Sequence, residues 1–150
     1  YICNLEEKSN FISYQTNLQD HRDLVENFKE YEIDCIFHTA ARINLSSVDN
    51  YLSFFRDNVN STINLLTAAS ALKIPKFVLS SSTSVYGFTH HKIIDESINP
   101  NPNTEYSWSK ILAESVCDYF SLNFNIEIVI FTEKESMLYN HQKEFNSGKR

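Results

Sequence analysis

The stretch that decides the fold begins with FVLSSSTSVYG (residues 77–87) and ends with EYSWSK (residues 105–110). We interpret its beginning as a short apolar strand that ends in a row of hydroxyl side chains. Its end places Tyr106 and Lys110 four residues apart, so on a helix they lie on the same face, one turn apart. An ammonium beside a phenol favours the phenolate and lowers its pKa. Helped by a serine hydroxyl, such a phenol can pass a proton to or from an alcohol or carbonyl oxygen.

These residues resemble the extended short-chain dehydrogenases, in particular the NAD-dependent epimerase/dehydratase family. The family's Ser-Ser-Ser-x-x-Val-Tyr-Gly strand end is matched by residues 80–87, and its Tyr-x-x-x-Lys pair by Tyr106 and Lys110. A Tyr-x-x-x-Lys pair alone is weak evidence, because many surface helices contain one by chance. The hydroxyl-rich strand end upstream of the pair argues against chance.

The resemblance implies that Ser82, Tyr106 and Lys110 are the catalytic residues. Tyr106 would be the general acid/base, and Lys110 would lower its pKa while holding a ribose hydroxyl. Ser82 would hydrogen-bond the substrate oxygen while the nicotinamide cofactor carries the hydride. Thr83 and Ser84 stay open as alternatives to Ser82, because hydroxyls at a strand end also satisfy loop backbone groups.

The composition is that of a folded globular protein, with 42% apolar and 21% charged residues in 150. No apolar run approaches the roughly 20 residues of a membrane helix, and the first residues lack signal-peptide features. The net charge of −6 comes without a basic cluster, which argues against nucleic acid as a partner. Cys3, Cys35 and Cys117 share no metal-type spacing and indicate free thiols. We expect a cytoplasmic protein with a small-molecule substrate, no metal, and neither membrane nor nucleic acid as a partner.

Glycine is scarce, and this bears on cofactor binding. The chain contains only Gly87 and Gly148, whereas a dinucleotide site needs a Gly-rich turn where backbone N–H groups meet the pyrophosphate. The chain also begins at Tyr1 and has Met137 as its only methionine. We therefore expect an excerpt, or a truncated product, of a longer protein.

Three further segments resemble the family's cofactor crevice. TNLQD (residues 16–20) is similar to Gly-Asp-Leu-x-Asp, with Asn17 in place of the acid that touches adenine. The strand that leads into Thr39, Ala40 and Ala41 is similar to Val-Ile-His-x-Ala-Ala, whose small residues let the backbone approach the cofactor; its His38 is expected to anchor the loop. NVNSTINLL (residues 58–66) is similar to Asn-Val-x-Gly-Thr-x-Asn-Leu-Leu, in which the asparagine supports the sheet and the crevice. The implied cofactor-binding residues are Asn17, Leu18, Thr39, Ala40, Ala41, Asn58, Ser80, Tyr106 and Lys110.

The remaining pattern alternates strands and helices. Strands are expected at residues 11–14, 33–39, 76–81 and 126–131, and helices from Asp20, between about residue 44 and residue 72, and over residues 106–123. In the last helix the expected buried face consists of Ile111, Leu112, Val116, Tyr119 and Phe120.

This alternation predicts an α/β fold with parallel strands and right-handed crossovers. With the resemblance, it implies a partial Rossmann-like, doubly wound sheet in a three-layer αβα arrangement. Residues 1–131 would form the central part of an NAD(P)-binding domain. Residues 132–150 would be a polar tail that diverges from the family.

Two hypotheses follow. In the first, the chain belongs to an NAD-dependent epimerase/dehydratase that acts on a nucleotide sugar, and the family resemblance also makes a homodimer an expectation. NADP stays open, because the residues that decide between the two lie at or before Cys3. In the second, the chain is a non-catalytic truncated remnant of that fold. A reductase of carrier-bound or steroid-like substrates is a further alternative within the enzyme class.

Overall fold

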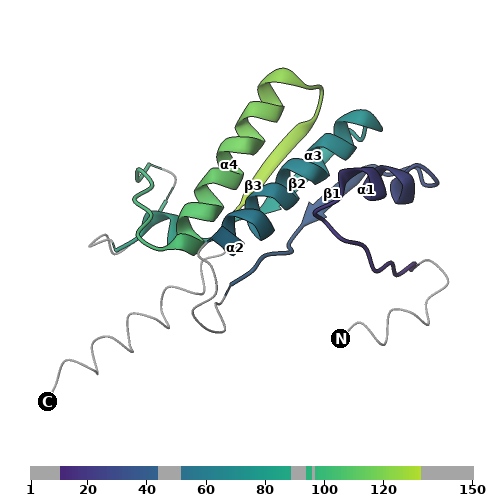
Figure 1. The fold of residues 1–150 in the computed structure, drawn as a ribbon. Helices are drawn as coiled ribbons and strands as arrows, with labels where there is room; N and C mark the ends of the chain where they lie inside the picture. The colour runs from purple at the N-terminus through teal and green to yellow at the C-terminus, as the bar shows by residue number, and fades with distance from the viewer. Residues whose placement is uncertain (1–10, 44–51, 89–93, 96, 133–150) are drawn as a thin grey trace, which may run out of the picture.

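The computed structural model of the chain describes residues 11–43, 52–88, 94–95 and 97–132. The elements follow one another as α1 (His21–Phe28), β1 (Cys35–His38), α2 (Leu52–Phe54), the π-helix η2 (Phe55–Asn60), α3 (Ser61–Ala71), β2 (Lys76–Ser80), the 3₁₀ helix η3 (Thr83–Tyr86), α4 (Glu105–Asn123) and β3 (Glu127–Phe131). The strands form a parallel sheet in the order β1-β2-β3 (Figure 1). In its register Phe77 lies between Ile36 and Ile128. The predicted α/β class with parallel strands is confirmed.

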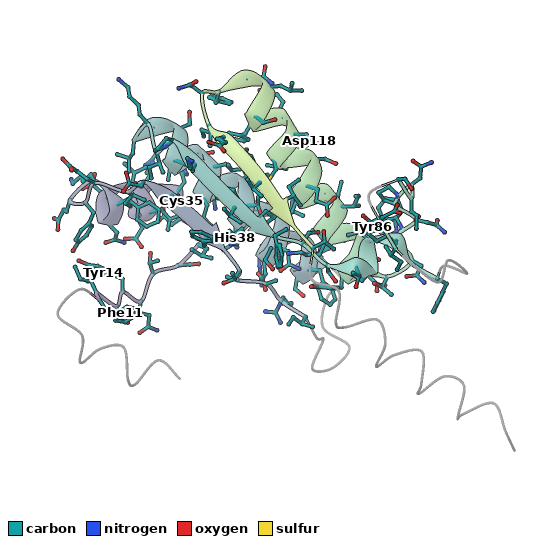
Figure 2. The ribbon with its side chains drawn as sticks, turned by 180° about the vertical axis from the view of Figure 1, so that it is seen from behind. Phe11, Tyr14, Cys35, His38, Tyr86 and Asp118 are labelled. Carbon is teal, nitrogen blue, oxygen red and sulfur yellow. The ribbon has the colours of Figure 1, made fainter. Side chains whose placement is uncertain are left out.

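The helices cover one face of the sheet, as the two opposite views in Figures 1 and 2 show. Side chains alternate along each strand, so Phe77 and Leu79 point into the core beneath the helices. Phe37 and Val129 point to the other face, where they are 71% and 49% exposed. The described residues therefore form two layers, and the second helical layer of the expected three-layer arrangement is not among them.

The start of α1 and the segment before it can be compared with the predictions from the sequence. The Asp20 carboxylate accepts hydrogen bonds from the backbone N–H groups of Arg22 and Asp23, at 3.0 and 3.3 Å, and caps α1 as expected. The expected strand at residues 11–14 is wrong, because this segment follows an irregular path and pairs with none of the three strands. A short apolar run becomes a strand only where a neighbouring strand satisfies its backbone groups.

The buried face of α4 differs from the predicted one. Its buried residues include Lys110, Ala113, Cys117 and Phe120, whereas Leu112 is 40% exposed. The prediction was therefore wrong for Leu112 and Tyr119, which both lie on the exposed side. The physical reason is close packing: the buried side of α4 carries mainly small side chains, and Phe120 is the one large apolar residue on it.

Several expectations fall outside the described residues, including Cys3 and most of the polar tail from residue 132. Parts of the segment from residue 44 and of the loop at residues 88–104 are also outside. Among the described helices, none combines the length and the apolar character that crossing a membrane requires.

Candidate active site at the carboxyl edge of the sheet

The hydroxyl cluster begins where β2 ends, and each of its first residues has a different partner. The Ser80 carbonyl accepts a hydrogen bond from the Lys110 ammonium. The Ser81 hydroxyl donates to the Glu114 carboxylate. The Ser82 hydroxyl accepts from the backbone N–H of Ser84 at 3.2 Å and caps η3. Of the three candidates Ser82, Thr83 and Ser84, Ser82 is the one that lies at the junction of β2 and η3.

Gly87 shapes the exit from this cluster. Its φ of 60° and ψ of −149° are open to glycine but rarely to other residues. A Cβ atom at Gly87 would lie 2.0 Å from the Asn101 carbonyl oxygen. The Asn101 N–H in turn donates to the Val85 carbonyl at 2.9 Å, so the loop returns tightly against η3. One of the two glycines of the chain is thus required by backbone geometry.

Lys110 is buried at 4% exposure, and its ammonium is held at the carboxyl end of β2. Burial lowers the pKa of this ammonium, while the negative charge of Glu114 acts in the opposite direction. Burial likewise raises the pKa of the Glu114 carboxyl, against the Ser81 hydrogen bond and the Lys110 charge. Lys110 and Glu114, one turn apart on α4, therefore hold two successive residues of the β2 end.

Tyr106 lies in the first turn of α4, and its ring packs against Phe54 with centroids 6.3 Å apart. The turn is fixed by a capping box, in which the Thr104 side chain and the Ser107 backbone and side chain bond reciprocally. Within the described residues, Lys110 bonds to the Ser80 carbonyl and makes no hydrogen bond to the Tyr106 phenol. Tyr106 and Lys110 thus lie on the same helix, and the Lys110 ammonium points to the carboxyl end of β2.

Asn58 is buried at 2% exposure in η2 and connects two other segments. Its Oδ1 accepts from the backbone N–H of Arg42 at 2.7 Å, and its Nδ2 donates to the Arg42 carbonyl at 3.1 Å. The same Nδ2 donates to the Ser109 hydroxyl at 2.9 Å. The sequence pattern singled out Asn58 but missed Arg42 and Ser109. Both lie next to a motif, but neither was recognised as part of it.

The small residues that were predicted to border the cofactor directly follow β1. Thr39 and Ala40 are exposed, and Ala41 is half-buried, at the carboxyl end of β1. His38 is buried, with its Nε2 3.1 Å from the Thr62 hydroxyl oxygen. Burial, together with the charge of Lys110, lowers the pKa of His38 to about 4. His38 therefore anchors α3 to β1 as a neutral side chain, rather than anchoring the loop.

Asn17 and Leu18 precede α1, at some distance in sequence from the other candidates. The Asn17 side chain accepts from the Gln19 N–H at 3.0 Å, which forms a local turn. The Leu18 carbonyl accepts from the Asn64 side chain in α3 at 2.9 Å. Leu18 is thereby tied to the helix that also contacts β1, whereas Asn17 is exposed. No group of three potential metal ligands occurs among the described residues.

The sequence model of the NAD dependent epimerase/dehydratase family matches residues 3–146. The chain belongs to this family. The UDP-glucose 4-epimerase of Mycoplasma genitalium is 33% identical over 134 residues, which cover 86% of this chain and 39% of the relative. The structure of UDP-glucuronic acid 4-epimerase from Bacillus cereus, in complex with UDP-glucuronic acid and NAD, matches with a TM-score of 0.76 at 30% identity, over 86% of this chain and 40% of that chain.

A second solved structure gives the same result. UDP-glucose 4-epimerase from Brucella ovis, in complex with NAD, matches with a TM-score of 0.74 at 26% identity, over 79% of this chain and 37% of that chain. The family and the Rossmann-like fold inferred from the sequence are therefore confirmed. The chain spans at most 40% of the length of each of these three proteins.

Proposed function

We propose that this chain contributes the proton-transfer residues of an NAD-dependent epimerase or dehydratase acting on a nucleotide sugar. The observation that carries the proposal is the buried Lys110 ammonium at the carboxyl end of β2, one helical turn after Tyr106. Ligands of open α/β sheets bind at this edge. The nucleotide-sugar epimerases to which the chain is similar support the substrate class.

The proposed roles follow from the chemistry of the side chains. Tyr106 moves the proton of a substrate hydroxyl, and the positive charge of Lys110 on the same helix favours its phenolate. Ser82, at the β2–η3 junction, donates a hydrogen bond to the same substrate oxygen. A bound nicotinamide cofactor supplies the hydride chemistry, and the chain orients the substrate and moves the proton.

The described residues fit one half of a dinucleotide. An ammonium has three N–H donors, and Lys110 uses one of them for the Ser80 carbonyl, which leaves donors for a ribose hydroxyl. Thr39, Ala40 and Ala41 allow close approach after β1, Asn58 holds that loop, and Asn17 and Leu18 would border the adenine. The sequence has no Gly-rich turn for the pyrophosphate. We propose NAD as the cofactor, with NADP as the alternative.

The test compares Tyr106→Phe with the unchanged chain in a UDP-sugar epimerisation assay. We expect turnover to fall by roughly 10²–10⁴-fold, because the general acid/base is lost, while NADH still quenches the fluorescence of Trp108. Tyr31→Phe, which removes a hydroxyl far from the strand end, serves as the matched control. Retained turnover in Tyr106→Phe contradicts the assignment.

The unchanged chain separates the alternative functions. If it binds NADH but shows no turnover, substrates of carrier-bound or steroid type are tried next. If it folds but does not bind NADH, the remnant hypothesis is favoured.

We also propose a cytoplasmic homodimer. The support for the dimer is a row of side chains along the exposed side of α4 at helical spacing, here called the outer stripe. Large exposed apolar patches mark sites of protein association, and the stripe is well suited to a second copy of the same helix. The outer stripe consists of Trp108, Leu112, Tyr119 and Leu122.

A further inference from the structure

A hydrogen-bond chain through Ser109 joins the first turn of α4 to the loop after β1. Ser109 has 0% exposure, and its hydroxyl donates to the Tyr106 carbonyl at 2.7 Å. The same oxygen accepts from the Asn58 Nδ2 at 2.9 Å. Both hydrogen bonds of the Ser109 hydroxyl have ordinary lengths.

The Asn58 end of this chain is rigid. Its side-chain amide makes two hydrogen bonds to the Arg42 backbone and one to Ser109, so its donors and acceptor are all engaged. Its backbone carbonyl accepts from the Ser61 and Thr62 hydroxyls at 3.2 and 2.8 Å. Asn58 lies in the π-helix η2, a distortion that often marks functional sites. Buried amides with complete partners have one orientation.

Tyr106 and Lys110 are consequently fixed to different strands. Lys110 is bonded to Ser80 at the end of β2. The backbone of Tyr106 is connected through Ser109 and Asn58 to the Arg42 loop after β1. The capping box fixes the backbone at the start of this turn, and the Ser109 hydroxyl adds an attachment to Asn58. Together they constrain where the Tyr106 ring can lie.

We propose that Ser109 is a positioning residue for Tyr106: its hydroxyl couples the turn that carries the phenol to Asn58 and the β1 loop. The inference deepens the proposed function and rests on it. A helical serine that bonds only to a carbonyl of its own helix would not make this connection. Ser121 makes the same bond to the carbonyl three residues earlier, Asp118, at 2.9 Å, but it is exposed and has no second partner in the described residues. The bond from Asn58 is what distinguishes Ser109.

The experiment measures kcat and KM of the full chain carrying Ser109→Ala, with Ser121→Ala as the matched control. We expect Ser109→Ala to lower kcat by roughly tenfold or more, as misplaced catalytic groups do, with an unchanged KM. Ser109→Thr, which keeps a hydroxyl able to bond the same carbonyl, should restore most of kcat. Equal kcat values for Ser109→Ala and the unchanged chain overturn the proposal while leaving the proposed function intact.

A second readout separates the two proposals if the unchanged chain shows no turnover. Trp108 lies in the same turn as Tyr106 and is the only tryptophan. We expect acrylamide to quench Trp108 more strongly in Ser109→Ala than in Ser121→Ala, and identical quenching overturns the proposal. Should Ser109→Ala fail to fold by circular dichroism, Ser109→Cys, of similar size but with a weak donor, takes its place in both measurements.

Discussion

His38 shows how burial fixes the protonation state of one residue. Its imidazole lies between β1 and α3, with the Thr62 and Ser61 hydroxyl oxygens 3.1 and 3.4 Å from Nε2. Lys110 is the charged group that acts on it, and this positive charge adds to the effect of burial. The pKa of His38 is lowered from 6.5 to about 4, so the folded chain holds the neutral form.

This shift predicts a pH dependence of stability. The unfolded chain binds a proton at His38 below about pH 6.5, whereas the folded chain binds it only below about pH 4. The contribution of His38 to the free energy of unfolding is therefore fully present above pH 6.5 and is lost as the pH falls toward 4. Between about pH 7.5 and pH 5 we expect a loss of about 2 kcal/mol from this residue. Urea unfolding at both pH values measures it. His38→Gln, which cannot titrate, should remove most of the difference; an equally large difference in that variant would show that other groups cause it.

At the residue scale the sequence singled out the side chains that we propose as reactive, but not the residues that contact and hold them. Tyr106, Lys110 and Asn58 stand out because motif spacing marks them. Ser109 and Glu114 gain their roles through contacts with residues 51 and 33 positions away in the chain. Such contacts depend on the π-helical turn and on how closely α4 approaches β2, which no local pattern encodes.

The end of α3 is set by the backbone of the turn that follows it. The sequence predicts a helix that runs to about residue 72, and α3 ends at Ala71, with Leu72 as its C-cap. The Lys73 N–H bonds to the Ser70 carbonyl at 3.2 Å, and the Ile74 N–H to the Ala69 carbonyl at 2.9 Å, which is the Schellman arrangement. Lys73 has a φ of 57°, the left-handed conformation that glycine adopts without steric cost.

We therefore expect Lys73→Gly to stabilise the chain. The left-handed conformation costs a residue with a Cβ about 1–2 kcal/mol, and part of this gain is offset by the greater freedom of glycine in the unfolded state. The net gain in the free energy of unfolding should be roughly 0.5–1 kcal/mol, measured by urea titration. Lys73→Ala is the control, since it removes the same charge and keeps the Cβ. An equal gain in both variants would assign the effect to the lysine side chain rather than to the backbone.

The element boundaries that the sequence predicted well are those set by local chemistry. Asp20 caps α1, and the predicted strand at 76–81 and helix at 106–123 each differ from the structure by one residue at one end. The buried face of α4 was misjudged because it is lined by small and polar side chains, including Ala113 and Cys117. Apolar periodicity finds a helix, but close packing decides which side is buried.

At the scale of the molecule, two separate apolar surfaces can be compared among the described residues. One is the outer stripe of α4, in which Leu122 is 84% exposed. The other is the sheet face opposite the helices, which is seen from the front in Figure 2. Phe37, Val129 and Phe131 are exposed on this face. The two surfaces lie on opposite sides of the two-layer structure, because α4 covers the face from which these three strand residues point away. A single substitution can therefore test each surface without disturbing the other.

The homodimer proposal assigns self-association to the outer stripe. We expect Leu122→Arg to convert a dimer into a monomer in sedimentation equilibrium, because a desolvated, unpaired charge at an interface between two copies is strongly unfavourable. The high exposure of Leu122 in the single chain means that the substitution should leave the thermal unfolding midpoint of the monomer nearly unchanged. Val129→Arg places the same charge on the sheet face and is expected to leave the dimer intact. The reverse outcome, with monomers only in Val129→Arg, would show that two copies associate through their sheets and that the outer stripe faces solvent.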